Sequence, residues 1–134
     1  MDRVSDCMEK FIDITPGFIS HWERHKEYWG DDERGLCIDL AAYSEFVCER
    51  LNDFSEEQRL SVFRMAEFLL LNGNDEVKDC VATCFLESIC NQISADGSKN
   101  GLDAELVVPY LGEKSREYVR AWDEFTGIKT PGLW

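Results

Sequence analysis

Apolar residues recur along this sequence at the spacing of an α-helix, and this pattern restricts the fold more than any other feature. Between residues 36 and 51 they follow one another at intervals of four, three, four and four, as Leu36, Leu40, Tyr43, Val47 and Leu51. That spacing places them on one face of a helix. Residues 36–40 alone would also suit the start of a strand, but the longer repeat outweighs that short run.

Residues that begin and end helices separate the periodic segments. Thr15 precedes Pro16, and Ser55 stands three residues before Gln58. Both patterns mark the start of a helix, because serine and threonine cap the first turn and proline suits the first helical position. Gly73 follows a long apolar segment and predicts its end. We expect helical segments near residues 4–12, 16–29, 36–51, 55–71, 75–93, 104–110 and 114–125.

The segment from residue 60 to residue 71 is apolar on nearly every side. A helix of this kind is buried, so we expect it at the centre of the molecule. The predicted fold class is all-α, with six to seven helices in a compact bundle of antiparallel pairs. The pairs can stack as HEAT or armadillo units do, although no sequence repeat of fixed period is present.

The length and composition suit one domain spanning residues 1–134. Apolar residues make up 44% of the chain and aromatic residues 12%, which is enough for a real core and argues against disorder. Two segments rich in glycine stand outside the helices. We expect a loop at residues 95–101 and a loose tail at residues 127–134.

The chain is strongly acidic. It has 27 Asp and Glu residues against 14 Lys and Arg residues, for a formal net charge of -13. Such a surface repels phosphate backbones and anionic lipid, so direct binding of nucleic acid or of a membrane is not expected. It attracts basic proteins. Acidity also serves solubility alone, and charge by itself does not decide between these interpretations.

No export signal is evident at the amino terminus, and no apolar run approaches the length needed to span a membrane. We therefore expect a cytoplasmic protein. Thiols remain reduced in the cytosol, and a buried cysteine behaves as a small hydrophobe. All six cysteines fall among apolar neighbours in predicted helices, so we expect core thiols at Cys7, Cys37, Cys48, Cys80, Cys84 and Cys90.

The sequence offers little for catalysis. His21 and His25 share one helical face, but the chain has no third histidine, and Trp22 stands where a zinc protease pattern needs glutamate. No phosphate-binding loop, nucleophile elbow or calcium loop is present. We expect no enzyme activity, no metal and no cofactor. A metal protein built on His21, His25 and a cysteine is the alternative that this pattern leaves open.

The remaining candidates are acidic surface groups. Carboxylates can occupy the cationic cleft of a nuclease by placing charge where phosphates would lie. Three groups stand out, and these nine residues are the candidate binding residues: Asp31, Asp32 and Glu33; Asp39, Glu45 and Glu49 along one helix flank; and Asp75, Glu76 and Asp79. A solvated helix face is the competing interpretation for each of them.

Several strings resemble a known family. They are EVKDCV at residues 76–81, CFLESI at residues 84–89 and PYLGEKSR at residues 109–116, with a further likeness over residues 35–51. The family consists of small helical bacterial proteins of unknown function, some of them encoded beside polymorphic-toxin genes. The resemblance covers most of the chain and carries no catalytic motif and no established binding residues.

This resemblance implies an immunity protein that binds and neutralises a cognate toxin domain of a contact-dependent inhibition or secretion system. A basic nuclease is the toxin that best suits an acidic inhibitor, although toxins of other chemistries also have inhibitors. The alternative is a helical-repeat adaptor that binds peptides or proteins on a concave surface. The toxin, the interface and the oligomeric state are left open by the sequence.

Overall fold

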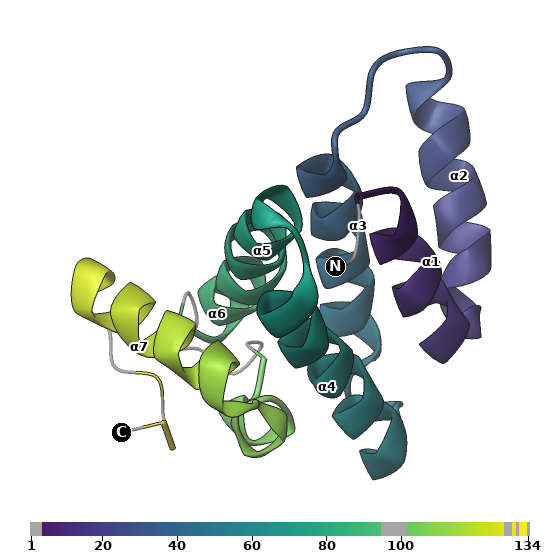
Figure 1. Ribbon diagram of the computed structural model, residues 1–134. Helices are drawn as coiled ribbons and strands as arrows, with labels where there is room; N and C mark the ends of the chain where they lie inside the picture. The colour runs from purple at the N-terminus through teal and green to yellow at the C-terminus, as the bar shows by residue number, and fades with distance from the viewer. Residues whose placement is uncertain (1–3, 95–101, 128–129, 131, 134) are drawn as a thin grey trace.

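A computed structural model of the chain describes residues 4–94, 102–127, 130, 132 and 133, and the loop expected at residues 95–101 lies outside this part (Figure 1). The described residues form an all-α fold without strands, as predicted. Its α-helices are α1 (Val4–Ile14), α2 (Ile19–Trp29), α3 (Leu36–Arg50), α4 (Glu56–Asn72), α5 (Asp75–Cys80), α6 (Glu87–Ser94) and α7 (Glu113–Thr126).

Four shorter helical elements complete the fold. A π-helix, η2 (Val81–Leu86), joins α5 to α6 without a break, so these three elements form the single rod expected near residues 75–93. A 3-10 turn, η1 (Pro16–Phe18), leads into α2. The helix expected at residues 104–110 is instead two 3-10 turns, η3 (Ala104–Leu106) and η4 (Val108–Tyr110).

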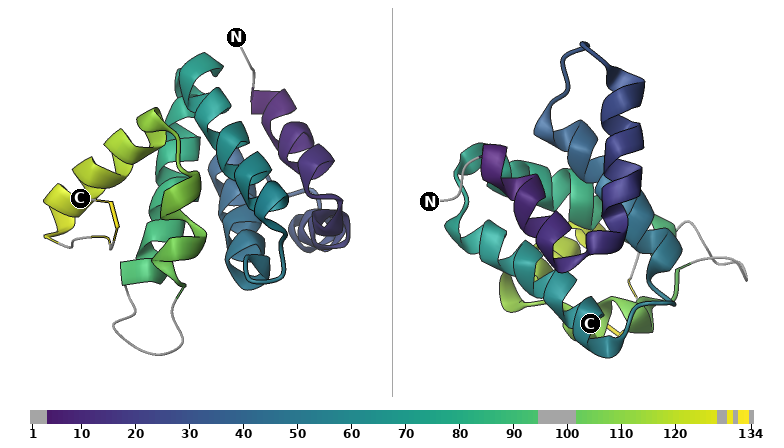
Figure 2. Two further views of the ribbon diagram at one scale, coloured as in Figure 1. Left: turned by 90° about the horizontal axis from the view of Figure 1, so that it is seen from below. Right: turned by 90° about the vertical axis from the view of Figure 1, so that its right-hand side faces the viewer.

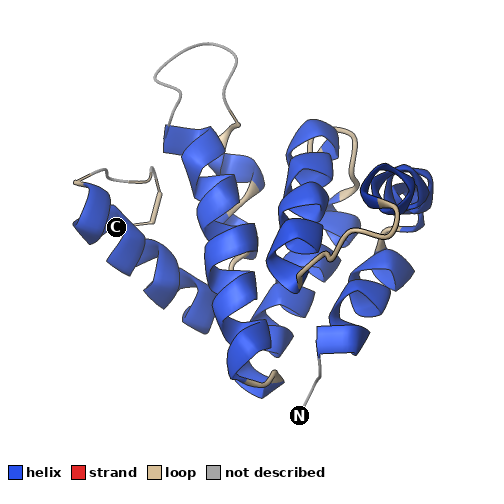
Figure 3. Cartoon of the chain, turned by 90° about the horizontal axis from the view of Figure 1, so that it is seen from above, coloured by secondary structure: helices blue, strands red, loops and turns tan. Residues whose placement is uncertain are grey.

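The helices form two layers arranged in a curved row (Figures 2 and 3). In one layer α4 contacts α1 on one side and α7 on the other. In the second layer α3 packs along η2 and α6, and α2 flanks α3 at the far end of the row (Figure 1). Helix α3 is therefore the middle member of its layer, and its outward side faces solvent between α2 and α6.

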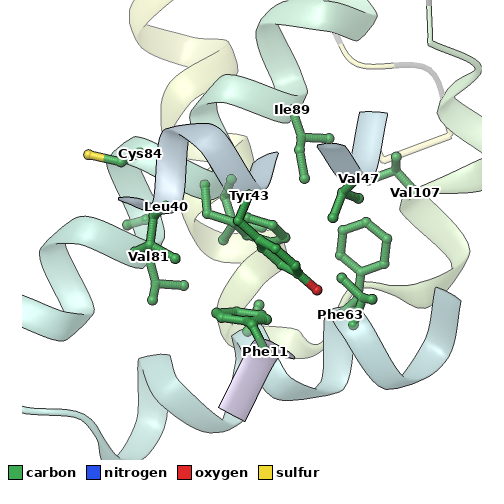
Figure 4. Packing of buried hydrophobic residues seen from close by; sticks show 14 of the residues in the cluster. Phe11, Leu40, Tyr43, Val47, Phe63, Val81, Cys84, Ile89 and Val107 are labelled. Carbon is green, nitrogen blue, oxygen red and sulfur yellow. The ribbon is translucent and has the colours of Figure 1, made fainter. Parts of the chain in front are cut away.

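The core lies between the two layers and is centred on Tyr43 of α3. Figure 4 shows its ring among side chains of other elements, including Phe11 of α1 and Phe63 of α4. The Phe11 and Tyr43 ring centroids are 4.6 Å apart, and the Tyr43 and Phe85 centroids 5.7 Å. The Tyr43 hydroxyl lies 2.9 Å from Oγ1 of Thr15, so the buried phenol has a polar partner.

Local capping explains two of the helix starts. Oγ of Ser55 accepts a hydrogen bond from the backbone N of Gln58 at 3.1 Å, as the sequence pattern predicts. The side chain of Asn74 caps α5 in the same way, accepting from N of Val77 at 2.9 Å. Thr15 was expected to cap a helix and does not, because its hydroxyl donates to the Phe11 carbonyl and meets Tyr43.

Helix α7 is capped from a distant part of the chain. The Glu67 carboxylate of α4 accepts hydrogen bonds from N of Lys114 at 2.9 Å and from N and Oγ of Ser115, each at 2.8 Å. Gly112 makes this approach possible, since a Cβ there would lie 2.4 Å from Cδ of Glu67. The contact fixes α7 against α4.

Two expectations about burial are wrong. Helix α4 is not buried on every side, because Phe68 is 44% exposed and Leu71 is 57% exposed where α4 has no covering helix between α1 and α7. The tail is not loose at its described residues. Thr130 and Leu133 are buried, and Thr130 donates through N and Oγ1 to the Asp123 carboxylate at 2.8 Å.

The expectation of six reduced core thiols is also wrong. A disulfide joins Cys37 in the first turn of α3 to Cys84 in η2, across a Cα–Cα distance of 5.3 Å. Cys37 is exposed, and the Cys84 sulfur points away from the Tyr43 cluster (Figure 4). The parallel packing of α3 on η2 brings the two residues together. Of the other four, Cys7 and Cys90 are buried, whereas Cys48 and Cys80 are half-buried.

Candidate protein-binding surface

The outward side of α3 carries an acidic line between α2 and α6. Ala41, Glu45 and Glu49 are spaced four residues apart and are all exposed, and we call them the α3 ridge. Among the described residues, neither glutamate carboxylate has an ion pair or a hydrogen bond. The ridge therefore presents two carboxylates whose charge is not neutralised within the part of the chain that the structure describes.

A groove lies on each side of the ridge, and both grooves are lined by Glu45 and Glu49. The α3–α6 groove has a volume of about 530 Å³. Its lining consists mostly of small polar and acidic side chains, and its members are Ala41, Ser44, Glu45, Cys48, Glu49, Asn52, Ser88, Gln92 and Leu102. None of these described lining residues is basic.

The α2–α3 groove, of about 510 Å³, has a different character. Aromatic rings and basic groups from η1 and α2 face the acidic ridge across it. The lining residues are Phe18, His21, Arg24, His25, Tyr28, Ala42, Glu45, Phe46 and Glu49. Tyr28 is 84% exposed at its rim. A large exposed aromatic side chain beside a hollow is typical of the anchor points of protein interfaces.

The half-buried thiol of Cys48 lies in the α3–α6 groove and reports its electrostatics. The pKa of the Cys48 thiol is raised to about 11, mainly by burial. A hydrogen bond with Ser44 acts in the opposite direction, and the charges of Glu45 and Glu49 contribute to the increase. A raised pKa leaves the thiol protonated near neutral pH, which makes it a poor nucleophile. The same repulsion that opposes a thiolate favours a cation in this groove.

Asp39 does not belong to the exposed flank where the sequence analysis placed it. It is 8% exposed, and its Oδ1 lies 2.6 Å from Nε of Arg34 and 2.9 Å from Nε2 of His25. Helical spacing puts Asp39 one turn from the core position Leu36 and next to Leu40, and it therefore faces inward toward α2. Its carboxylate holds the α2–α3 connection together, so we leave Asp39 out of the binding surface.

The other predicted acidic residues are exposed but lie outside both grooves. Asp31, Asp32 and Glu33 occupy the connector between α2 and α3, just before the first turn of α3. Asp75, Glu76 and Asp79 lie on α5, which contacts α3. Both groups thus adjoin the same end of the α3 layer (Figure 1). The structure brings Glu45 and Glu49 together, and it places the other six around the first turns of α3 and α5.

The two histidines have separate structural partners. The His21 ring packs on Phe46 with centroids 4.9 Å apart, whereas His25 pairs with Asp39. Within residues 4–94 and 102–127 and the described tail positions, no group of three or more His, Cys, Asp or Glu side chains is placed to hold a metal ion. None of the helices in these residues has the length and apolar character needed to cross a membrane.

The sequence strings that resemble a known family lie within a family match that covers most of the chain. A family described as Domain of unknown function (DUF7674) matches residues 8–127. The chain belongs to this family. The match spans all of the helices that form the ridge and its grooves. Comparison with curated proteins and with solved structures gives no match.

Most of the groove residues of this DUF7674 domain escaped the sequence analysis. Cys48, Asn52 and Gln92 are not unusual residues, and only the packing of α3 against α6 brings them together. The available signal was the exposed four-residue spacing of Ala41, Glu45 and Glu49, opposite to the apolar face of α3. That spacing identifies a ridge. It does not reveal that the ridge has a groove on each side.

Proposed function

We propose that this chain is an immunity protein that binds a cognate toxin domain, a basic nuclease, and covers its active site or substrate cleft. The observation that carries the proposal is the α3 ridge, where Glu45 and Glu49 have no ion pair with another described residue and lie between two open grooves. The net charge of -13 and the resemblance to proteins encoded beside toxin genes support it.

The physical basis is the match between an acidic surface and a cleft built for phosphate groups. Charge attraction speeds the encounter of the two proteins. The lifetime of the complex depends instead on side chains buried in pockets at the centre of the interface. The two grooves supply such pockets, and the exposed Tyr28 supplies an aromatic anchor. Binding of this kind requires no catalytic group in the inhibitor.

If the gene beside that of this chain encodes a toxin domain, growth rescue in cells that express this domain tests the proposal. We expect the native chain to restore growth and the ridge variant Glu45→Lys/Glu49→Lys to fail. Glu9→Lys/Asp13→Lys is the matched control, because these α1 residues are also exposed and four apart but line neither groove. Rescue by the ridge variant equal to that by the control would contradict a role for the ridge.

Association kinetics separate the ridge from the remaining acidic groups. Reversal of Asp31, Asp32 and Glu33, or of Asp75, Glu76 and Asp79, to lysine is expected to lower the on-rate about tenfold at low salt, with a smaller effect at high salt. Reversal of the ridge is expected to raise the off-rate as well, because its carboxylates line the pockets. Unchanged kinetics in both triple variants would remove those groups from the interface.

The second candidate is a helical-repeat adaptor, and the aromatic α2–α3 groove favours it. Such a groove can hold apolar side chains of several different peptides. An adaptor would bind several partners weakly and would not restore growth in the toxin assay. An immunity protein would bind one partner tightly.

A further inference from the structure

The α3–α6 groove differs from the α2–α3 groove in a way that bears on what each accepts. His21, Arg24 and His25 face the ridge across the α2–α3 groove, so that side carries positive groups of its own. Among the described residues that line the α3–α6 groove none is basic, and they include two carboxylates and two carboxamides. Of these two grooves, the α3–α6 groove is therefore the one in which an incoming cation meets acceptors without a competing basic side chain among the described lining residues.

The Ser88 hydroxyl of this groove is arranged as an acceptor too. Oγ of Ser88 in α6 donates its hydrogen to the carbonyl of Cys84 at 3.0 Å. A hydroxyl that has committed its single hydrogen has only lone pairs left to offer. Acceptors thus line the α3 wall and the α6 wall alike.

Building on the proposed function, we propose that the α3–α6 groove binds an arginine side chain of the basic partner, with the guanidinium group between Glu45 and Glu49. A guanidinium has five N–H donors in a flat, fixed arrangement and can pair with several acceptors at once, whereas an ammonium group is a compact point charge. Carboxylates pair with guanidinium groups in a bidentate manner. The side-chain oxygens of Asn52 and Gln92 serve the remaining donors. The volume of about 530 Å³ accommodates the whole arginine side chain.

The test uses the full chain labelled with 15N and titrated with the peptide acetyl-Gly-Arg-Gly-Arg-Gly-amide. Backbone amide shifts are expected to change at Ser44, Cys48 and Gln92, which line the groove. The same peptide with citrulline in place of arginine keeps the shape and hydrogen-bonding side chain but loses the charge. It is expected to bind at least about tenfold more weakly, as is the lysine peptide.

Three variants locate the site. Glu45→Gln/Glu49→Gln is expected to raise the Kd for the arginine peptide about tenfold, because it removes both charged acceptors. Gln92→Arg places a guanidinium at the groove itself and is expected to weaken binding similarly. Glu9→Gln/Asp13→Asn makes the same charge change on α1 and is expected to alter the Kd by less than about twofold. All of these positions are exposed, so the variants are expected to fold.

Several results would overturn the inference. Equal binding of the lysine peptide would remove the preference for guanidinium. Shifts around Glu9 and Asp13 as large as those at Ser44 and Cys48 would show attraction to acidic surface in general. The proposed function is tested separately. If the peptide binds in the groove but the chain neutralises no toxin, the immunity role is rejected and the arginine site is retained. If Gln92→Arg rescues growth as well as the native chain does, the arginine site in the groove is rejected and the immunity role is retained.

Discussion

Among the residues that act through hydrogen bonds and are not fully buried, Glu67 is the one whose loss we expect to damage the fold most. Its carboxylate holds three donors at the start of α7, and Gly112, which precedes that helix, offers no side-chain cap of its own. Glu67→Ala leaves these donors without their partner. Because hydrogen bonds to a charged group are the stronger ones, we expect the free energy of unfolding to fall by about 2–3 kcal/mol. Urea denaturation followed by circular dichroism measures this change.

The matched control is Glu117→Ala in α7. Glu117 is exposed and makes one ion pair, 3.2 Å from Nζ of Lys114, which is worth at most about 0.5 kcal/mol. A second variant, Gly112→Ala, brings a Cβ against Glu67 and is expected to be destabilising through the same contact. Equal losses for Glu67→Ala and Glu117→Ala would show that the cap contributes little.

The caps illustrate which residue roles sequence reasoning can find. Ser55 and Asn74 cap the helices that follow them directly, so their roles can be predicted from neighbouring residues. Glu67 lies 47 residues from Lys114 along the chain, and no local pattern connects them. The prediction that Asp39 lies on an exposed flank was wrong for the same reason. Its acidic neighbours on α3 suggested an exposed flank, whereas its partners Arg34 and His25 become visible only once α2 is placed.

At the scale of elements, the rod α5–η2–α6 shows how far the helical repeat extends. The positions predicted for its apolar face, Val77, Val81, Cys84, Phe85, Ile89 and Ile93, are all buried. The π-helix in its middle was not predicted. A wider turn inserts one extra residue into the repeat, and Ala82 and Leu86 are buried as well. This broadened face contacts α3, α4 and α7, so η2 joins the two layers.

The disulfide between α3 and η2 is expected to contribute strongly to stability. It closes a loop between cysteines 47 residues apart, and the chain-entropy relation gives about 4 kcal/mol for a loop of this size. Reduction, or the substitution Cys37→Ser, is therefore expected to lower the free energy of unfolding by up to that amount. Cys37 is exposed, so the serine variant leaves no cavity. Thermal melts with and without a reducing agent measure the effect.

Cys80→Ser provides the control for the disulfide, because Cys80 is half-buried and is not a member of it. The stability of the Cys80→Ser variant should still fall on reduction, whereas reduction should not change the stability of the Cys37→Ser variant. A melting temperature that is independent of reductant in the native chain would argue against the disulfide in solution. The sequence could not select this pair, since six cysteines allow 15 pairings and the cytoplasmic location expected from the sequence predicted reduced thiols.

For the molecule as a whole, the helical class and the succession of helices followed from periodicity and caps, whereas the layer arrangement did not. Periodicity identifies the face that each helix buries but not the neighbour that covers it. Helix α4 shows the difference. Its apolar character predicted burial on every side, yet none of the described helices covers Phe68 and Leu71. The two grooves could not be predicted from the sequence either, because they arise from the spacing between neighbouring helices.

The whole fold is also expected to become less stable at alkaline pH, because it buries groups that lose a proton there. Burial raises the pKa of the Cys48 thiol to about 11 and that of the Cys90 thiol to about 12, from an ordinary value of 9.0. Burial likewise raises the pKa of the Tyr43 hydroxyl, against the effect of its hydrogen bond with Thr15. Each of these groups remains protonated in the folded state over a range where the unfolded chain has already lost the proton.

The sign of the effect follows from proton binding. Above about pH 9 the unfolded chain binds fewer protons than the folded one, so each of the two thiols lowers the free energy of unfolding by up to about 1.4 kcal/mol per pH unit. Below that pH the stability should be nearly independent of these groups. Urea denaturation at a series of pH values from about 8 to 10.5 measures the slope. Cys48→Ala should reduce the slope by about one thiol's share, and an unchanged slope in that variant would show that the Cys48 pKa is not raised by its groove.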